Sequence, residues 1–301
     1  MSANHFESCK YLAVFDEYNC NELNDERTYH EAMHIIEEKK ALYDTDEVKQ
    51  QLLQSVELTS LTVTDSEESI LKFTDRVNKF YDEHPDAPTI ATICVYPNFA
   101  KIVDEALEVE GIGIACVSGC FPSSQTFIEV KTIETALAVK DGATEIDMVM
   151  NVGAFLSGDY ETCADEIFEI KSAGAETPLK VILETGALAS AAAIKKASVL
   201  AMCAGADFIK TSTGKEAISA TPEAALVMCE AIKEYYKETG RKVGFKAAGG
   251  IDSVKKALAY YTIVKEVLGE EWLDNGLFRI GASRLANQLL SEILNEDIKF
   301  F

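Results

Sequence analysis

Residues 207–215 read Asp-Phe-Ile-Lys-Thr-Ser-Thr-Gly-Lys, so a lysine stands where a short apolar run gives way to polar residues. The apolar run is typical of a buried strand, and the Thr, Ser and Gly residues after it indicate that the strand has ended. Lys210 is therefore predicted to lie at the carboxyl end of a strand, next to the loop that follows it.

A second lysine, Lys246, has the same setting one predicted strand later, within residues 243–250. Two ammonium groups in one cavity repel each other, and partial desolvation also disfavours the charged form. The pKa of one lysine then falls below its ordinary value of about 10.4. A neutral amine is the nucleophile that imine formation with a carbonyl needs. A single lysine at a strand end more often binds a phosphate or caps a loop, and the second lysine favours the nucleophile instead.

Eight strand-like runs recur from residue 56 onward, with one amphipathic helical stretch predicted in each interval. The predicted strands are 56–61, 89–96, 112–117, 145–151, 179–184, 207–211, 243–247 and 277–281, and the predicted helices are 67–83, 100–108, 127–141, 158–173, 187–204, 222–239 and 253–268. Alternation of this kind implies parallel strands joined by right-handed crossovers, and eight units predict an α/β fold of the (β/α)8 TIM barrel type. An open doubly wound sheet is the alternative, but no G-x-G-x-x-G follows the first strand.

Residues 1–54 are predicted to form an N-terminal helical extension, with a helix over 28–53, and residues 55–301 to form the barrel domain. The extension contains His30-Glu31-Ala32-Met33-His34, which matches the H-E-x-x-H pattern of zinc proteases. A catalytic zinc needs a third protein ligand and a cleft. We expect neither in a short terminal segment, so the pattern is interpreted as a solvated helix surface and no metal site is predicted.

An acid on the fourth predicted strand is expected to join the lysines. Alternation along residues 145–151 puts Asp147 and Asn151 on one side and apolar residues on the other, which should pack against helices. Strand carboxyl ends and the loops after them carry the functional groups of such barrels, so Lys210, Lys246 and Asp147 are predicted to be neighbours. Asp147 is suited to moving protons during imine formation, and a structural salt bridge to a core lysine such as Lys180 is the alternative.

Glycines near three strand ends indicate an anion site. Gly249-Gly250 and Gly281-Ala282-Ser283 follow the seventh and eighth strands, and Gly214-Lys215 follows the sixth. Backbone N–H groups there can approach a ligand, and the loops after strands seven and eight of barrels often hold phosphate. A phosphorylated substrate is therefore predicted.

The composition limits the partners. The 50 acidic side chains outnumber the 28 basic ones, and a net charge of -22 argues against nucleic acid or an anionic membrane as partner. No apolar run is long enough to span a membrane, and the first residues lack the features of a signal peptide, so a cytoplasmic protein is expected. The eight cysteines form no C-x-x-C pair and are predicted to be reduced. Self-association into a homo-oligomer is compatible with a barrel of this size.

Five ordered motifs resemble deoxyribose-phosphate aldolase, and the likeness runs from about residue 56 to 294. The motifs are 145–147 (Glu-Ile-Asp), 179–186 (Leu-Lys-Val-Ile-Leu-Glu-Thr-Gly), 208–215, 244–250 (Gly-Phe-Lys-Ala-Ala-Gly-Gly) and 279–283 (Arg-Ile-Gly-Ala-Ser). The resemblance implies a class I aldolase on a (β/α)8 barrel that needs no cofactor. It also implies reversible cleavage of 2-deoxy-D-ribose 5-phosphate to D-glyceraldehyde 3-phosphate and acetaldehyde, in deoxyribonucleotide catabolism.

Residue by residue, the resemblance makes Lys210 the Schiff-base lysine, Lys246 the lysine that lowers its pKa, and Asp147 the proton donor and acceptor. Cys94 matches a cysteine near the family's site, with a packing role as the alternative. The resemblance assigns substrate and phosphate binding to Thr213, Gly214, Lys215, Gly249, Gly250, Gly281 and Ser283.

Several positions depart from the family pattern. Glu57 stands in place of an aspartate, Ala247 replaces a proline, and the chain ends in Phe300-Phe301 without the terminal tyrosine of some members. Asp252 would repel a phosphate if it pointed inward, and Arg284 would then compensate. These departures keep open another class I phosphosugar aldolase or a transaldolase-like enzyme. A non-catalytic phosphosugar-binding protein is a further alternative.

Overall fold

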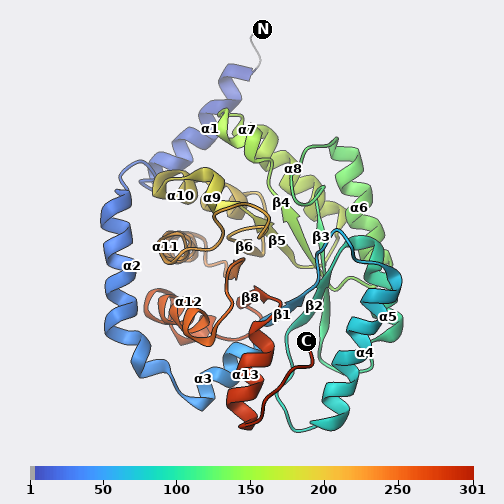
Figure 1. Cartoon of the computed structure of the whole chain (residues 1–301). Coiled ribbons are helices and arrows are strands. Elements are labelled where there is room, and N and C mark those ends of the chain that lie inside the picture. Colours follow the sequence, from blue (N-terminus) through green and yellow to red (C-terminus); the bar gives the residue numbers. More distant parts are fainter. Residues whose placement is uncertain (1–3) are drawn as a thin grey trace.

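Eight parallel strands close into one barrel in the computed structural model, which describes residues 4–301 and the side chains from residue 10 on (Figure 1). The strands are β1 (Val56–Thr59), β2 (Thr92–Val95), β3 (Gly113–Ser118), β4 (Glu145–Val149), β5 (Leu179–Ile182), β6 (Phe208–Lys210), β7 (Gly244–Ala248) and β8 (Phe278–Ala282). Pairing of β1 with β8 closes the ring. The predicted (β/α)8 barrel is confirmed, and the open doubly wound sheet is excluded.

The strand register places the charged residues of neighbouring strands at similar heights along the barrel axis. Lys210 on β6 pairs with Lys246 on β7, and Lys246 pairs with Arg279 on β8. On the other side, Asp147 on β4 pairs with Lys180 on β5. Because inward and outward positions alternate along each strand, these residues can meet in the barrel interior.

Helices surround the barrel, and most of them begin at a capping side chain. The helices after β1 are α4 (Glu67–Glu83), α5 (Ala100–Ala106), α6 (Ile128–Lys140), α7 (Val152–Leu156), α8 (Tyr160–Ala173), α9 (Thr185–Leu188), α10 (Ala191–Cys203), α11 (Pro222–Thr239), α12 (Val254–Leu268) and α13 (Leu285–Leu294). Thr221 accepts from the Ala224 N–H in front of Pro222, as the start signal at α11 predicts. The helix predicted over 187–204 instead begins at Ala191, because Ala189 takes a left-handed conformation that ends α9.

The N-terminal extension is helical, but the single helix predicted over 28–53 is wrong. It consists of α1 (Asn4–Glu17), α2 (Asp25–Lys39), the 3-10 turn η1 (Lys40–Tyr43) and α3 (Asp46–Gln54). The chain breaks because Thr45 is extended and caps the N–H of Val48, which starts a new helix. Residues 1–3 of the predicted extension lie outside the described part of the chain.

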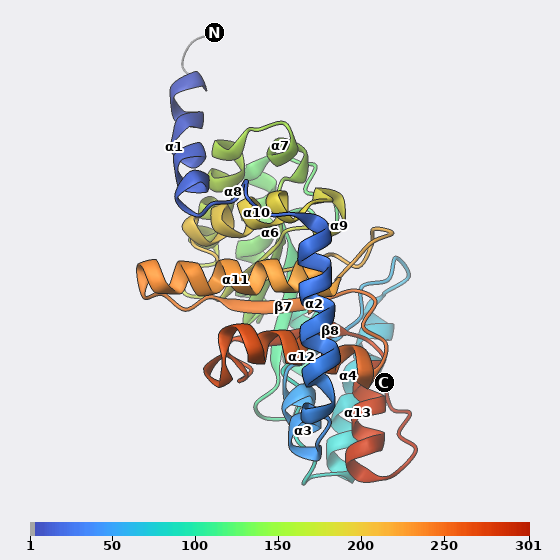
Figure 2. The same ribbon diagram turned by 90° about the vertical axis from the view of Figure 1, so that its left-hand side faces the viewer.

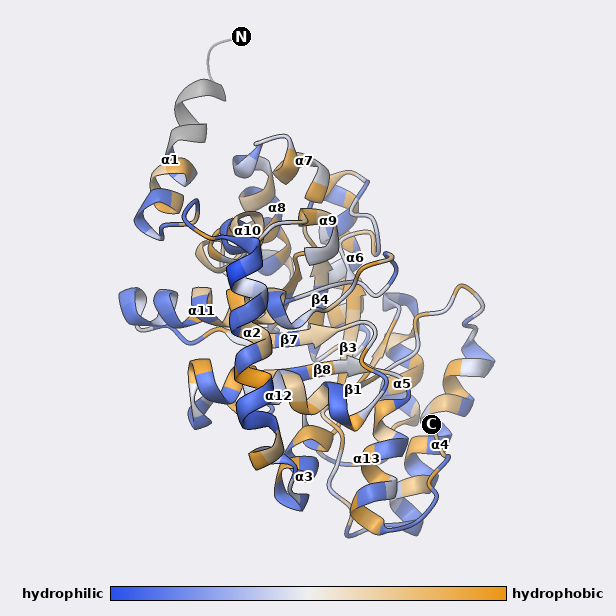
Figure 3. Ribbon diagram, turned by 60° about the vertical axis from the view of Figure 1, so that its left-hand side comes forward, coloured by the Kyte–Doolittle hydropathy of each residue, from blue (hydrophilic) through white to orange (hydrophobic). Residues whose placement is uncertain are grey.

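The extension packs on the barrel. Figure 2 shows α2 crossing the outward side of α11 and α12, with which it is in contact. Hydrophilic residues cover most of α2 in Figure 3, whereas its buried residues Thr28, Ala32 and Ile36 face the barrel helices. Ile36 of α2 and Leu52 of α3 belong to the same hydrophobic core as the barrel strands. The extension therefore shares its core with the barrel, and a boundary at residue 54 remains a proposal.

His30 and His34 lie exposed on α2, and His34 pairs with Glu38 of the same helix. Seven cysteines with described side chains are unpaired, while Cys9 lies outside the described side chains. Within residues 4–301, none of the helices combines the length and apolarity that crossing a membrane requires.

Replacing Leu52 by Ala should lower the free energy of unfolding by about 2–5 kcal/mol, because the side chain is fully buried in the shared core. Urea unfolding of the whole chain, followed by circular dichroism, measures the change. Leu42→Ala is the control, since Leu42 is 64% exposed on η1, and it should change little. No more loss of stability in Leu52→Ala than the small change expected for Leu42→Ala would show that this contact does not stabilise the fold.

Candidate active site

Asp147 and the two lysines meet at the centre of the barrel. The Nζ of Lys210 donates to Oδ2 of Asp147 at 2.7 Å, and the Nζ of Lys246 donates to the same oxygen at 2.5 Å. All three side chains are almost fully buried. The structure thus brings together the three residues that the sequence predicts to be neighbours.

The surroundings shift the pKa values of Lys210 and Lys246 in opposite directions. Burial lowers the pKa of Lys210, and the ammonium of Lys246 lowers it further, which outweighs the attraction of Asp147. Burial also disfavours the charged form of Lys246, but the carboxylates of Asp147 and Glu57 raise its pKa above the ordinary value. Lys246 therefore keeps its proton while Lys210 loses its own more easily, as an amine nucleophile requires.

Asp147 is held as a carboxylate. Burial alone would raise the pKa of Asp147, but Lys180, Lys210 and Lys246 together lower it well below its ordinary value. Lys180 donates to the other oxygen, Oδ1, at 3.0 Å. The salt bridge to Lys180 and the contact with the lysine pair are therefore present together, one on each oxygen of the same carboxylate.

Beneath this group lies a layer of charges that the sequence did not assign. Arg279 donates to both oxygens of Glu145, at 2.7 and 2.9 Å, and to Glu57 at 3.3 Å. Lys180 donates to Glu145 at 2.5 Å, and burial opposes ionisation of Glu145, yet Lys180 and Arg279 lower its pKa to about 2. The longer acid at position 57 is fully buried and binds Lys246 directly.

We call these side chains the charged network; its members are Glu57, Glu145, Asp147, Lys180, Lys210, Lys246 and Arg279. Fully ionised, it carries four positive and three negative charges. Loss of one proton makes it neutral, and Lys210 is the lysine whose pKa is lowered. The charge balance therefore favours a neutral amine at Lys210.

A cavity of about 540 Å³ opens above Lys210. All seven residues predicted to bind substrate or phosphate line it: Thr213, Gly214, Lys215, Gly249, Gly250, Gly281 and Ser283. The end of β1 and the loop after it, residues 59–62, also line the cavity, and no sequence motif indicated this. The Nζ of Lys215 reaches across to the carbonyl oxygen of Leu61 in this loop.

Two glycines lie in close packing at this mouth. Gly249 has φ +88°, and a Cβ there would lie 2.6 Å from the Cβ of Ser219. A Cβ on Gly281 would lie 3.2 Å from the Cε of Lys246. Gly249 thus lets the loops after β6 and β7 touch, and Gly281 leaves room for the second lysine.

The departures from the family pattern have clear positions. Asp252 is exposed at the cavity rim and pairs with Lys256 at 2.9 Å, while Arg284 lies on the same wall. Lys256 and Arg284 therefore partly compensate the negative charge of Asp252. Phe300 and Phe301 pack against Phe80 of α4 and do not line the cavity.

Asn151 does not share the inward face of Asp147, because β4 ends at Val149 and the Asn151 side chain accepts from the Ala154 N–H at the start of α7. The thiol of Cys94 lies near the carboxylates of Glu57 and Asp147, but lysine ammonium groups already bind both carboxylates. Burial raises the pKa of Cys94 to about 11, which fits a packed thiol.

Sequence reasoning missed Glu184, which positions the loop after β6. Its backbone is left-handed, with φ 56°, and its carboxylate accepts from the Thr213 hydroxyl at 2.5 Å and from the Thr213 N–H at 3.3 Å. Burial raises the pKa of Glu184. The signal was within the motif of residues 179–186, but only the structure shows which loop the acid holds.

Comparisons with known proteins agree on one family. The model described as DeoC/LacD family aldolase matches residues 59–278. The chain is 43% identical over 250 residues to the human protein named deoxyribose-phosphate aldolase, covering 79% of this chain and 78% of that one. It is 42% identical over 258 residues to a Caenorhabditis elegans protein named putative deoxyribose-phosphate aldolase, covering 84% of each. The solved apo form of a putative deoxyribose-phosphate aldolase from Toxoplasma gondii superposes with a TM-score of 0.74 at 25% identity, covering 83% of this chain and 98% of that one.

Glu184→Ala should raise the amide hydrogen-exchange rate of the loop after β6 roughly tenfold, because Thr213 loses the acceptor for its N–H and hydroxyl. Exchange followed by mass spectrometry of peptides covering residues 211–221 measures the rate. Glu216→Ala removes an exposed acid of the same loop and should leave the rate unchanged. An unchanged rate in Glu184→Ala would remove this residue from the loop's support.

Proposed function

The chain belongs to the DeoC/LacD family of aldolases, and on that premise we propose that it reversibly cleaves 2-deoxy-D-ribose 5-phosphate into D-glyceraldehyde 3-phosphate and acetaldehyde. The names of the human and Caenorhabditis elegans relatives support this substrate. The observation that carries the proposed mechanism is the pair Lys210 and Lys246 on one oxygen of Asp147, with the pKa of Lys210 lowered.

The reaction begins with neutral Lys210, whose Nζ attacks C1 of the open-chain sugar phosphate. A carbinolamine forms and loses water, which leaves a protonated imine as an electron sink. The hydroxyl on C3 gives up its proton, the C2–C3 bond breaks, and its electron pair forms the enamine between C1 and C2. C3 becomes the aldehyde carbon of D-glyceraldehyde 3-phosphate.

The cycle closes when C2 of the enamine takes up a proton. Water then adds to the imine and releases acetaldehyde, which returns Lys210 to its free amine. The carboxylate of Asp147 lies 2.7 Å from Nζ of Lys210 and is assigned the proton transfers, directly or through a water molecule. Lys246 stays protonated and keeps Lys210 neutral.

The cavity above Lys210 is assigned to the phosphate end of the substrate. Lys215 and Arg284 supply positive charge, and the loops around Gly249, Gly250 and Ser283 offer backbone N–H groups and a hydroxyl. Lys210 lines the same cavity, so one bound molecule can place its phosphate at these loops and its C1 at Lys210.

Reduction with borohydride in the presence of acetaldehyde should add a two-carbon group to the chain, because the imine at Lys210 becomes a stable secondary amine. Intact-mass analysis detects the adduct and peptide mapping places it. Lys210→Ala should abolish it, with circular dichroism confirming that the variant is folded.

Other outcomes distinguish the alternatives. An adduct without cleavage of 2-deoxy-D-ribose 5-phosphate would indicate an aldolase for another phosphosugar, and a panel of donor aldehydes would identify it. A folded protein that forms no adduct would contradict the mechanism and favour a phosphosugar-binding protein.

The rate of imine formation should rise with pH through the lowered pKa of Lys210, because only the neutral amine reacts. Lys246→Met should move this rise to higher pH by about one unit, since the neighbouring ammonium is lost. The pH profile of single-turnover imine formation with acetaldehyde measures the shift. Lys215→Met removes a lysine outside the charged network and should leave the profile's position unchanged; a shift of the same size there would contradict the role of Lys246.

We also propose a cytoplasmic location, a place in deoxyribonucleotide catabolism and self-association of the chain. Unpaired cysteines among residues 10–301 support a reducing compartment.

Exposed apolar side chains of α6, including Val130, Ile133 and Leu137, support a contact between copies. Sedimentation analysis of Ile133→Asp would test that contact.

A further inference from the structure

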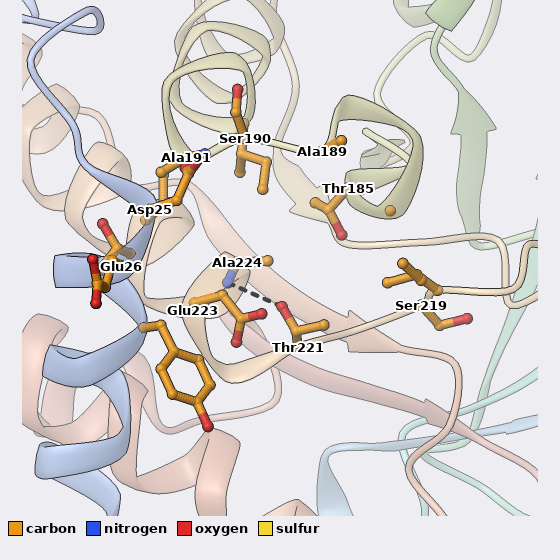
Figure 4. Close-up of a pocket in the computed structure, with 16 residues that line it drawn as sticks. Asp25, Glu26, Thr185, Ala189, Ser190, Ala191, Ser219, Thr221, Glu223 and Ala224 are labelled. Atoms are coloured by element: carbon orange, nitrogen blue, oxygen red, sulfur yellow. Dashed lines mark hydrogen bonds between the residues drawn. The ribbon is translucent and has the colours of Figure 1, made fainter.

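A second cavity of about 480 Å³ lies between the N-terminal extension and the barrel helices (Figure 4). Its walls come from the first turn of α2, from α9 and the start of α10, and from the start of α11 with the loop before it. It shares no lining residue with the cavity above Lys210. The expectation that the terminal segment borders no cleft is therefore wrong, although His30 and His34 do not line this one.

The cavity has apolar walls and an apolar rim. Ile194 and Val227 are buried in the walls, and Tyr29 and Ile218 stand at the edge with 48% and 58% of their surface exposed. The volume is within the range of small-molecule sites, about 300–1,000 Å³. The body of a fitting ligand is therefore apolar.

Three acidic residues line the cavity, Asp25, Glu26 and Glu223, and the Asp25 carboxylate accepts from the Ala191 N–H at 2.7 Å. Among the side chains described from residue 10 on, no Lys, Arg or His pairs with any of them. The N-termini of α2, α10 and α11 also meet here, and each is equivalent to roughly half a positive charge. They offset only about half of the three negative charges, so the cavity favours a cation.

A buried hydroxyl provides a separate sign of a ligand. Thr185 is 3% exposed, and its Oγ1 has no hydrogen-bond partner. Figure 4 shows this oxygen pointing toward the space bounded by Ser219, Thr221 and Glu223. The neighbouring hydroxyl of Thr221 is already used, since it accepts from the Ala224 N–H. Buried polar groups normally have partners, so Thr185 is available to a ligand's N–H.

We propose that this cavity binds a small organic ammonium ion with an apolar body. The carboxylates attract the ammonium, the Thr185 hydroxyl accepts one of its N–H bonds, and the apolar body packs against Ile194, Ile218 and Val227. This site is independent of the proposed aldolase reaction, since no residue of the charged network contributes to it.

The experiment titrates the full chain, carrying 13C-labelled isoleucine methyl groups, with cyclohexylamine. The methyl signals of Ile194 and Ile218 should shift and saturate, while that of Ile93 on β2 should not. Cyclohexanol, which lacks the charge, and ammonium chloride, which lacks the apolar body, should produce no saturable shift at the same concentrations. Saturable binding of cyclohexanol with equal affinity would overturn the proposal.

Variants complete the test. Glu223→Gln and Thr185→Val should each weaken cyclohexylamine binding roughly tenfold, because each removes one polar partner of the ammonium. Glu110→Gln removes an exposed acid far from the cavity and should leave the affinity unchanged. Equal affinity in Glu223→Gln, Thr185→Val and Glu110→Gln would reject the site. Adduct formation at Lys210 in every variant confirms folding and reports separately on the proposed aldolase.

Discussion

The carboxylate of Asp147 accepts hydrogen bonds from three lysine side chains in the middle of the barrel, and the rest of the site depends on these contacts. Burying four cations with three carboxylates leaves one uncompensated charge, which is costly in a desolvated interior. The least costly correction is loss of one lysine proton. The network therefore favours a neutral amine at Lys210 through charge balance as well as through burial.

The position of each lysine decides which one loses its proton. Lys246 contacts two carboxylates, those of Asp147 and Glu57, whereas Lys210 pairs with Asp147 alone and stands at the cavity. Lys180 is held still deeper by three acids. The three lysines thus differ in protonation because they contact different numbers of carboxylates: one for Lys210, two for Lys246 and three for Lys180.

Local patterns predicted the parts of this arrangement that depend on one strand and its loop. The alternation around Asp147 predicted that this acid faces inward. The polar residues after Lys210 predicted the end of its strand, and the glycines predicted the mouth of the cavity. The contacts of Arg279 with Glu145 depend on how β8 and β4 face each other across the barrel, which no single stretch encodes. Glu184 and the cavity beside α2 likewise arise from packing between distant segments, and the break at Thr45 followed a cap that helical periodicity did not reveal.

The charged network also constrains how the chain can fold. Its members come from β1, β4, β5, β6, β7 and β8, so Glu57 meets Lys246 and Arg279 only when the first strand reaches the last two. Without this closure, Glu57 would not reach the two cations that pair with it. Closure of the ring between β1 and β8 and completion of the charged network therefore depend on the same strand pairing.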